Sequence, residues 1–319
     1  MTSHVIAAPT NDRVLIPFTR PERNTATQLT PPGSCNSILV DLMHYGEPYQ
    51  RADRLLALLD GEAPLVVPSA WDPGSARLLE RAGARAIGIQ LDDLVWSLGH
   101  ASWTSAPDEV VTACVRTCRA VIDVPVMADL STASESSIVG EPPDLTNLLR
   151  LLIAGGVAGI TVAGEAMVDG RIPHENLLGC ITRDASTRLF VEARVDPAVI
   201  DTDAGGRKHQ TQYTEMLRLG RACAAAGAQG VLVSGCYASH AVRLVRDVPI
   251  PVSIDVSHGW AAPVQVFARA GVRSVRLGHG PLQAALGLMK GVVAEALERG
   301  SYDLMNRHMS RAAGARRPA

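Results

Sequence analysis

Short apolar runs alternate with helix-like segments eight times in the part of this chain that begins near residue 64. A polar or glycine-containing turn follows each run, and most turns lead into a segment with helical periodicity. Parallel strands can be joined only by long crossovers, so this alternation predicts parallel pairing with right-handed connections. Eight such units close into a (β/α)8 barrel, or TIM barrel, which is the predicted α/β fold.

The predicted strands cover residues 64–69, 86–91, 124–129, 158–162, 188–194, 229–233, 250–255 and 273–277. The predicted helices cover residues 76–82, 107–121, 143–154, 211–226, 237–246, 261–270 and 281–298. The alternative fold is an open doubly wound sheet, which would place a Gly-x-Gly-x-x-Gly turn after its first strand. No such turn follows residue 69, so the sequence favours the barrel.

The barrel is predicted to span residues 51–300, a usual length for such a domain. Residues 1–50 are predicted to form an N-terminal arm and helix. Pro, Thr, Asn and Gly break any periodicity near the start, whereas leucines return at helical spacing within 37–60. We expect this helical extension to lie outside the main core. Residues 301–319 are predicted to form a C-terminal tail.

Composition excludes several classes of partner. The formal net charge is −2 and no basic stripe is present, which argues against nucleic-acid binding. No apolar run approaches the roughly 18 residues that a membrane span needs, so no membrane association is expected. The start of the chain lacks the charged and apolar regions of a secretory signal. The six cysteines are scattered, which is typical of reduced thiols in a cytoplasmic protein, and we predict that localisation.

The C-terminal ends of the strands of a TIM barrel meet at one mouth, where active sites lie. Asp129 ends an apolar run, and a carboxylate there is costly unless it meets a cation, a metal or several donors. Arg194 ends an equally apolar run and suits bidentate capture of a carboxylate or phosphoryl group. The structural alternatives are an acceptor for loop N–H groups and an ion pair within the barrel rim.

Other polar side chains should reach the same mouth. Asp92 and Asp93 are adjacent, so in a strand at most one of them would point inward. His258 and His279 are candidates for proton transfer near neutral pH, although a histidine near a loop is more often a hydrogen-bonded rim residue. The segment 164–187 is long for a loop in a compact domain, which suggests a lid or a binding loop. The full set is Ser69, Asp72, Gln90, Asp92, Asp93, Asp129, Ser131, Glu165, Arg194, Asp196, Ser234, Cys236, Tyr237, Asp255, Ser257, His258 and His279.

Several motifs resemble, in order along the chain, those of the isocitrate lyase/phosphoenolpyruvate mutase superfamily. They are Val-Val-Pro-Ser-Ala-Trp-Asp-Pro-Gly-Ser-Ala-Arg-Leu at 66–78, Ser-Leu-Gly at 97–99, Pro-Val-Met-Ala-Asp at 125–129, Gly-Gly-Val-Ala-Gly-Ile at 155–160 and Ala-Arg-Val-Asp at 193–196. The resemblance implies a TIM barrel, commonly in a dimer or tetramer that exchanges the last helix. It also implies an enzyme that makes or breaks C–C or P–C bonds in small α-oxocarboxylate-type substrates, with Mg²⁺ stabilising an enolate-like intermediate.

The chain departs from the superfamily pattern at the acids associated with the metal. The superfamily's third strand reads Asp-Ala-Asp-Thr-Gly, and here Asp129 is followed two residues later by Ser131. The acidic pair that usually follows the fourth strand is replaced by Ala163 and Gly164. The resemblance therefore implies a divergent member whose metal dependence is doubtful, with Asp129 as the remaining anchor for Mg²⁺.

We predict a lyase-like enzyme that makes or cleaves a C–C or P–C bond in a small carboxylate substrate, and that forms a homo-oligomer. The predicted catalytic residues are Asp129, Asp92, His258 and Asp255. The predicted substrate-binding residues are Trp71, Asp72, Gln90, Arg194, Ser234 and Glu165. One alternative is a catalytically idle barrel that binds a metabolite or a protein partner. Another is a phosphate site at the Gly278-His279-Gly280 turn before the last long helix.

Overall fold

The structure is a computed structural model, and it describes residues 49–102, 107–121, 123–131, 145–170, 189–196, 208–257 and 261–314. The chain divides into two units, residues 1–34 and 35–319, and every described residue belongs to the second. His258 lies outside the described residues. No helix in the described part of the chain is both long and apolar enough to cross a membrane.

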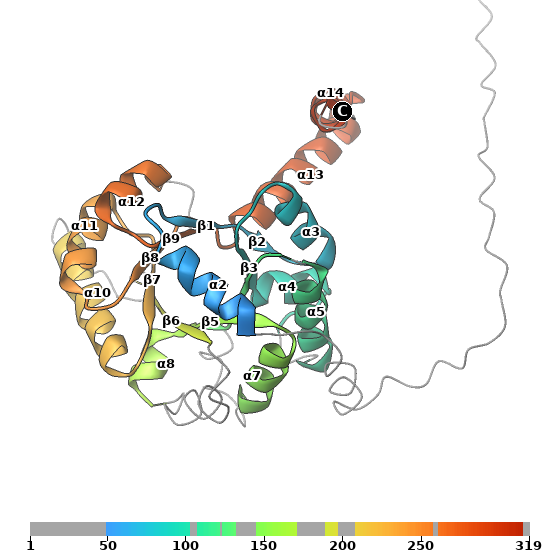
Figure 1. Ribbon diagram of the computed structural model, residues 1–319. Coiled ribbons are helices and arrows are strands. Elements are labelled where there is room, and N and C mark those ends of the chain that lie inside the picture. Colours follow the sequence, from blue (N-terminus) through green and yellow to red (C-terminus); the bar gives the residue numbers. More distant parts are fainter. Residues whose placement is uncertain are drawn as a thin grey trace, which may run out of the picture. The chain divides into compact units, whose positions relative to one another are not determined.

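The described residues form a parallel sheet that curls into a barrel with helices around it (Figure 1). The strands are β1 (Leu65–Val67), β2 (Ser69–Ala70), β3 (Ile87–Gln90), β4 (Val126–Asp129), β5 (Val157–Ala163), β6 (Phe190–Val195), β7 (Gly230–Ser234), β8 (Val252–Asp255) and β9 (Ser274–Arg276). The helices are α2 (Tyr49–Leu59), α3 (Pro73–Arg81), α4 (Leu91–Ser97), α5 (Pro107–Ala120), α7 (Leu145–Ala154), α8 (Gly164–Val168), α10 (Lys208–Ala225), α11 (Ala238–Asp247), α12 (Val264–Ala270), α13 (Gly280–Arg299) and α14 (Asp303–Gly314).

The first predicted strand is present in two pieces, and these pieces close the barrel. β1 pairs with β9 and β2 pairs with β3, so one short segment joins the two ends of the sheet. Pro68 separates the pieces because a proline has no N–H to give to a neighbouring strand. Its carbonyl still accepts a hydrogen bond from the N–H of Gly88 at 2.8 Å, while the carbonyl of Val67 accepts one from Leu277 on the other side. The predicted TIM barrel is therefore confirmed.

The strands are apolar because both of their faces are covered. Every residue of β4, β5 and β7 is buried, as expected for parallel strands packed between the barrel interior and the surrounding helices. Helix α3 begins with a capping box, in which an oxygen of Asp72 accepts a hydrogen bond from the N–H of Ser75 at 2.6 Å. This cap fixes the turn between the closing strand and its helix.

Helix α2 lies outside the main hydrophobic cluster, as expected, and belongs to a second, smaller cluster at the start of the strands. Its apolar face packs onto the start of several strands, and Leu55 is fully buried among Met127, Ala158 and Phe190. A Cβ atom at Gly159 would lie 3.0 Å from the side chains of Leu55 and Met127, so the glycine makes room for the helix. The helix thus covers the N-terminal end of the barrel and leaves the opposite end for the site.

Two short helices that the sequence analysis did not predict follow strands at that opposite end. Helix α4 begins directly after β3, so Asp92 and Asp93 lie on a helix and not on a strand. Helix α8 occupies the beginning of the segment 164–187, and the remainder of that segment is outside the described residues except for Asp169 and Gly170.

Candidate active site

The centre of the barrel mouth is an arginine held between two carboxylates. Nη1 of Arg194 donates hydrogen bonds to Oδ2 of Asp255 at 2.9 Å and to Oγ of Ser234 at 2.7 Å. Nη2 of Arg194 forms an ion pair with Oδ2 of Asp129. The exposed fraction is 14% for the Arg194 side chain and below 5% for both carboxylates. The sequence placed these two acids, the arginine and the serine at the mouth, and the structure brings all four together.

Strand register explains this convergence. Asp129, Ser234 and Asp255 are the last residues of β4, β7 and β8, and Arg194 lies one residue before the end of β6. Ser234 is opposite Asp255 in the parallel pairing, so their side chains emerge at the same level. Because parallel strands have the same direction, their final residues meet at one face of the barrel.

Each carboxylate is fixed by a local hydrogen bond as well as by Arg194. Oδ1 of Asp129 accepts hydrogen bonds from the backbone N–H and the hydroxyl of Ser131, at 3.1 and 2.7 Å. Oδ1 of Asp255 accepts one from the N–H of Ser257 at 2.9 Å. Burial alone would raise the pKa of Asp129, but the charge of Arg194 and the hydrogen bonds from Arg194 and Ser131 together lower that pKa below its usual value. Asp129 is therefore ionised at neutral pH.

A second ion pair lies inside the barrel, and sequence reasoning missed it. Nη2 of Arg276 on β9 contacts Oε2 of Glu192 on β6 at 2.5 Å, and both side chains are buried. Glu192 precedes Arg194 by two residues, so the two side chains share one face of their strand. Thr161 donates a long hydrogen bond of 3.4 Å to the same glutamate oxygen. A charged residue inside an otherwise apolar strand was the signal that could have revealed this pair.

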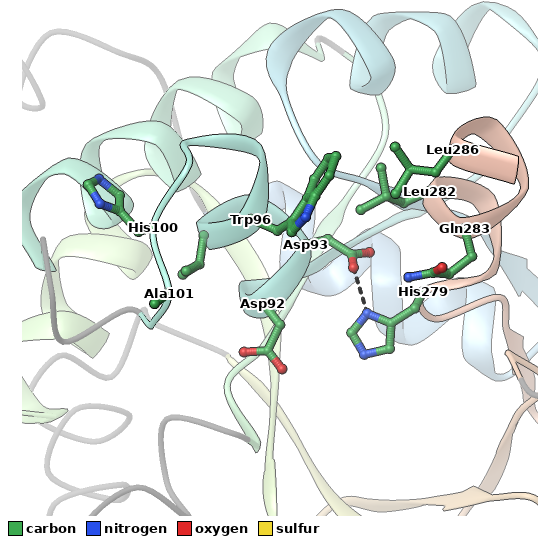
Figure 2. A pocket seen from close by; sticks show the side chains of 10 residues that line it. Asp92, Asp93, Trp96, His100, Ala101, His279, Leu282, Gln283 and Leu286 are labelled. Atoms are coloured by element: carbon green, nitrogen blue, oxygen red, sulfur yellow. Dashed lines mark hydrogen bonds and ion pairs between the residues drawn. The ribbon is translucent and has the colours of Figure 1, made fainter. Parts of the chain in front are cut away.

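A histidine and an aspartate form a third polar group at this end of the barrel. Nδ1 of His279, just before α13, lies 2.6 Å from Oδ1 of Asp93 on α4 (Figure 2). A cavity of about 400 Å³ opens beside them. Its lining combines polar and apolar side chains from α4, from the segment after it and from the start of α13: Asp92, Asp93, Val95, Trp96, His100, Ala101, His279, Leu282, Gln283 and Leu286.

The other predicted site residues occupy varied positions. Gln90 is buried at the end of β3 and is paired in register with Asp129. Asp92 is exposed on the wall of the cavity, and Glu165 is half-buried in the first turn of α8. Asp72 caps helix α3. Trp71 is half-buried beside it, and its backbone N–H donates a hydrogen bond to Oγ of Ser75. His258 lies outside the described residues.

The central carboxylates, as arranged, do not fit a divalent cation. Asp129 and Asp255 use all four of their oxygens to accept hydrogen bonds from Ser131, Ser257 and Arg194. The cationic group between them is a guanidinium, which would repel Mg²⁺. Among the described residues, no group of three or more His, Cys, Asp or Glu side chains could hold a metal ion.

One family of known proteins matches most of this chain in sequence. Residues 55–297 match the family model of phosphoenolpyruvate phosphomutase. No curated protein matches the chain in sequence.

Solved structures resemble the chain in fold. A protein of Burkholderia cenocepacia J2315, provisionally assigned as a lyase/mutase, is 21% identical over 85% of this chain and 96% of its own, with a TM-score of 0.66. The phosphoenolpyruvate phosphomutase of Streptomyces platensis subsp. rosaceus is 22% identical over 83% of this chain and 98% of its own, with a TM-score of 0.60. Oxaloacetate acetylhydrolase, solved with the product oxalate, is 18% identical over 85% of this chain and 99% of its own, with a TM-score of 0.62.

Proposed function

Because this chain belongs to the phosphoenolpyruvate phosphomutase family, we propose that it is an enzyme that makes or breaks a C–C or P–C bond in a small carboxylate substrate. The reaction would pass through an enolate-like intermediate. The chain is a divergent member in this proposal, because its central site is built around one arginine and two carboxylates. The single observation that supports it most strongly is the position of Arg194 at the mouth of the barrel.

Arg194 can bind the carboxylate of a substrate. The Arg194 side chain is 14% exposed, and its Nη1 donates to the neutral hydroxyl of Ser234 as well as to Asp255. A substrate carboxylate could take the place of that hydroxyl as an acceptor at Nη1. Burial would lower the pKa of Arg194, but Asp129 and Asp255 raise it above its usual value, so the positive charge persists. That fixed charge would also stabilise negative charge developing on an enolate oxygen.

Asp129 and Asp255 orient the arginine in this proposal. An effective general base has a pKa near the working pH, and the pKa of Asp129 is lowered below its ordinary value. Its ion pair with Arg194 instead holds the guanidinium in one orientation before the substrate arrives.

The proposal is tested by isothermal titration with oxaloacetate, 2-methylisocitrate and phosphonopyruvate, each with and without Mg²⁺. We expect at least one ligand to bind, and the variant Arg194→Lys to bind it about tenfold or more weakly, because an ammonium cannot replace the planar fork of donors. The matched control is Arg218→Lys, since Arg218 is an exposed arginine paired with Glu215 on α10. Absence of binding for all three ligands under both conditions would overturn the proposal.

A catalytically idle barrel is the second candidate. The observation that favours it is that Arg194 is already neutralised by two carboxylates of the same chain. In that case a ligand would bind with unchanged covalent structure after prolonged incubation, which ³¹P and ¹³C NMR of the titrated ligands would show. Conversion of any of the three ligands would exclude this candidate.

We also propose that the chain forms a homo-oligomer through its last helices. Met289, Val293 and Leu297 follow one another at spacings of four on α13, so they share one helix face, and they are 59%, 49% and 82% exposed. Figure 1 shows α13 leading away from the barrel, with α14 packed on it. An exposed apolar face of this kind is typical of a subunit interface.

The oligomer can be tested by light scattering after gel filtration. We expect a dimer or tetramer for the unmodified chain and a smaller species for Leu297→Glu, because a carboxylate would be buried without a partner. Glu298→Lys is the matched control, since this exposed charged residue lies on the other side of the same helix. A monomeric unmodified chain would contradict the proposal.

A further inference from the structure

We propose that His279, positioned by Asp93, is the group that transfers a proton to or from the substrate carbon next to the carbonyl. This inference rests on the proposed function and deepens it, because it assigns the acid–base chemistry of the same mouth to a specific pair of residues. Neither residue belongs to the cluster around Arg194 described above.

The geometry of the pair leaves one imidazole nitrogen available. Nδ1 of His279 donates to Oδ1 of Asp93 at 2.6 Å, which fixes the ring orientation and places the free lone pair of the neutral ring on Nε2. Figure 2 shows Nε2 on the side of the ring that points away from Asp93. The His279 side chain is 43% exposed and lines the cavity of about 400 Å³, so a ligand can reach it.

Asp93 has the properties of a positioning group. It is 4% exposed, and its second oxygen, Oδ2, has no hydrogen-bond partner among the described residues. Because the carboxylate is buried and its Oδ1 is bonded to Nδ1, it can hold the imidazole in one orientation without contacting the ligand.

The charges around His279 favour a role in proton transfer. The hydrogen bond to Asp93 raises the pKa of His279, burial lowers it, and the charges of Asp93, Asp92 and Asp129 raise it, so that the result lies above the ordinary histidine value. The N-terminus of α13 acts in the opposite direction, because its partial positive charge disfavours an imidazolium. His100 also lines the cavity, and its Nε2 is paired with Glu109 at 2.8 Å.

Two titratable groups at one mouth are thus pushed apart in pKa, which is the usual basis for dividing roles between them. Asp129 has a lowered pKa and remains ionised, whereas the hydrogen bond to Asp93 raises the pKa of His279 above its ordinary value. Gly278, which precedes His279, lies against the arginine cluster, since a Cβ atom on it would stand 2.8 Å from Oδ1 of Asp255. The arginine cluster would hold the substrate carboxylate while the imidazole faces the adjacent carbon.

The proposed step balances without another reactant. Nε2 of neutral His279 takes a proton from the carbon next to the substrate carbonyl. The electron pair of the broken C–H bond forms the C=C bond of the enolate, and the carbonyl π pair moves onto the oxygen. In the reverse direction the imidazolium returns the proton to that carbon, and the carbonyl is restored.

Hydrogen–deuterium exchange tests this step directly. The methyl protons of pyruvate and the methylene protons of phosphonopyruvate are followed by ¹H NMR in D2O with the full-length protein. We expect the unmodified chain to accelerate exchange, and His279→Gln to slow it by about 100-fold or more, as is usual when a general base is removed. His308→Gln is the matched control, since His308 is an exposed histidine on α14, and it should exchange at the unmodified rate.

The variant Asp93→Asn distinguishes positioning from a merely structural role. Exchange needs neutral His279, so its rate should rise with pH through the pKa of this residue. Because Asp93 raises that pKa, its replacement should shift the rise in the pH–rate profile to lower pH, and the histidine titration followed by NMR should shift with it. If Asp93 had only a structural role, Asp93→Asn would lower the exchange rate without shifting the pH at which the rate rises.

The outcomes separate the inference from the proposed function. If His279→Gln exchanges within threefold of the unmodified chain, or if the unmodified chain binds a ligand and does not accelerate exchange, the role of His279 is overturned and substrate binding at Arg194 stands. If the unmodified chain neither binds nor exchanges any ligand, the proposed function fails, and the role of His279 fails with it.

Discussion

Replacing Arg194 by methionine is expected to destabilise the folded protein by about 3–5 kcal/mol at neutral pH, the usual loss when a buried ion pair is broken from one side. The variant would leave Asp129 and Asp255 buried without their shared cation. The expected loss comes chiefly from these two uncompensated charges, because methionine fills much of the same volume. Urea unfolding of the two proteins at pH 7.5 measures it.

The pH dependence of this loss identifies its cause. The pKa of Asp129 in the folded protein is lowered below its unfolded value, so its contribution to stability is present above the unfolded pKa. That contribution disappears as the pH falls through the folded pKa. In the variant, burial and the neighbouring carboxylate raise the pKa of Asp129, so protonation relieves the repulsion. The difference in stability between the two proteins should therefore shrink as the pH falls from 7.5 towards about 5.

Two further variants make the Arg194 prediction decisive. Adding Asp129→Asn to Arg194→Met should restore part of the lost stability, because one of the two charges disappears. Arg218→Met serves as the control, since the exposed ion pair of Arg218 with Glu215 should contribute less than about 1 kcal/mol. A loss below about 1 kcal/mol for Arg194→Met at pH 7.5 would contradict the buried-charge explanation.

Much of the barrel and the centre of its mouth could be predicted from the sequence for one physical reason. In a parallel sheet every strand delivers its last residues to the same face, so knowing where Asp129 and Arg194 end their apolar runs is enough to bring them together. Even the exception, the split of the first strand at Pro68, follows from the missing N–H of proline. Contacts between strand ends need only the register, and that is what hydrophobic periodicity specifies.

The pair of His279 and Asp93 could not be assembled in this way. The apolar pattern predicts a strand through Leu91, with Asp92 and Asp93 pointing to opposite faces, whereas α4 begins at Leu91 and turns Asp93 inward. An error of one residue at the end of a strand changes which of two adjacent acids is buried. The partner of Asp93 lies 186 residues away, and nothing in the local sequence of either residue indicates the other.

Replacing Glu192 by glutamine is expected to destabilise the protein by about 3–5 kcal/mol, because Arg276 would remain buried without a counter-charge. Glu192 is fully buried and Arg276 is 4% exposed, so water cannot take the place of the lost carboxylate. Ser274, which accepts a hydrogen bond of 3.4 Å from Nε of Arg276, is neutral and cannot replace it either. Urea unfolding is the appropriate measurement, since an ionic denaturant would screen the charges.

The double variant Glu192→Leu, Arg276→Met separates the need for a charge pair from the need for a filled interior. A buried ion pair that is replaced on both sides by apolar groups often leaves stability unchanged or increased, since two desolvated charges are removed together. We expect the double variant to recover most of the stability that Glu192→Gln loses, and Glu298→Gln, at an exposed position on α13, to change nothing. If the double variant is as unstable as the single one, the interior of the barrel depends on the specific shape and hydrogen bonds of the pair.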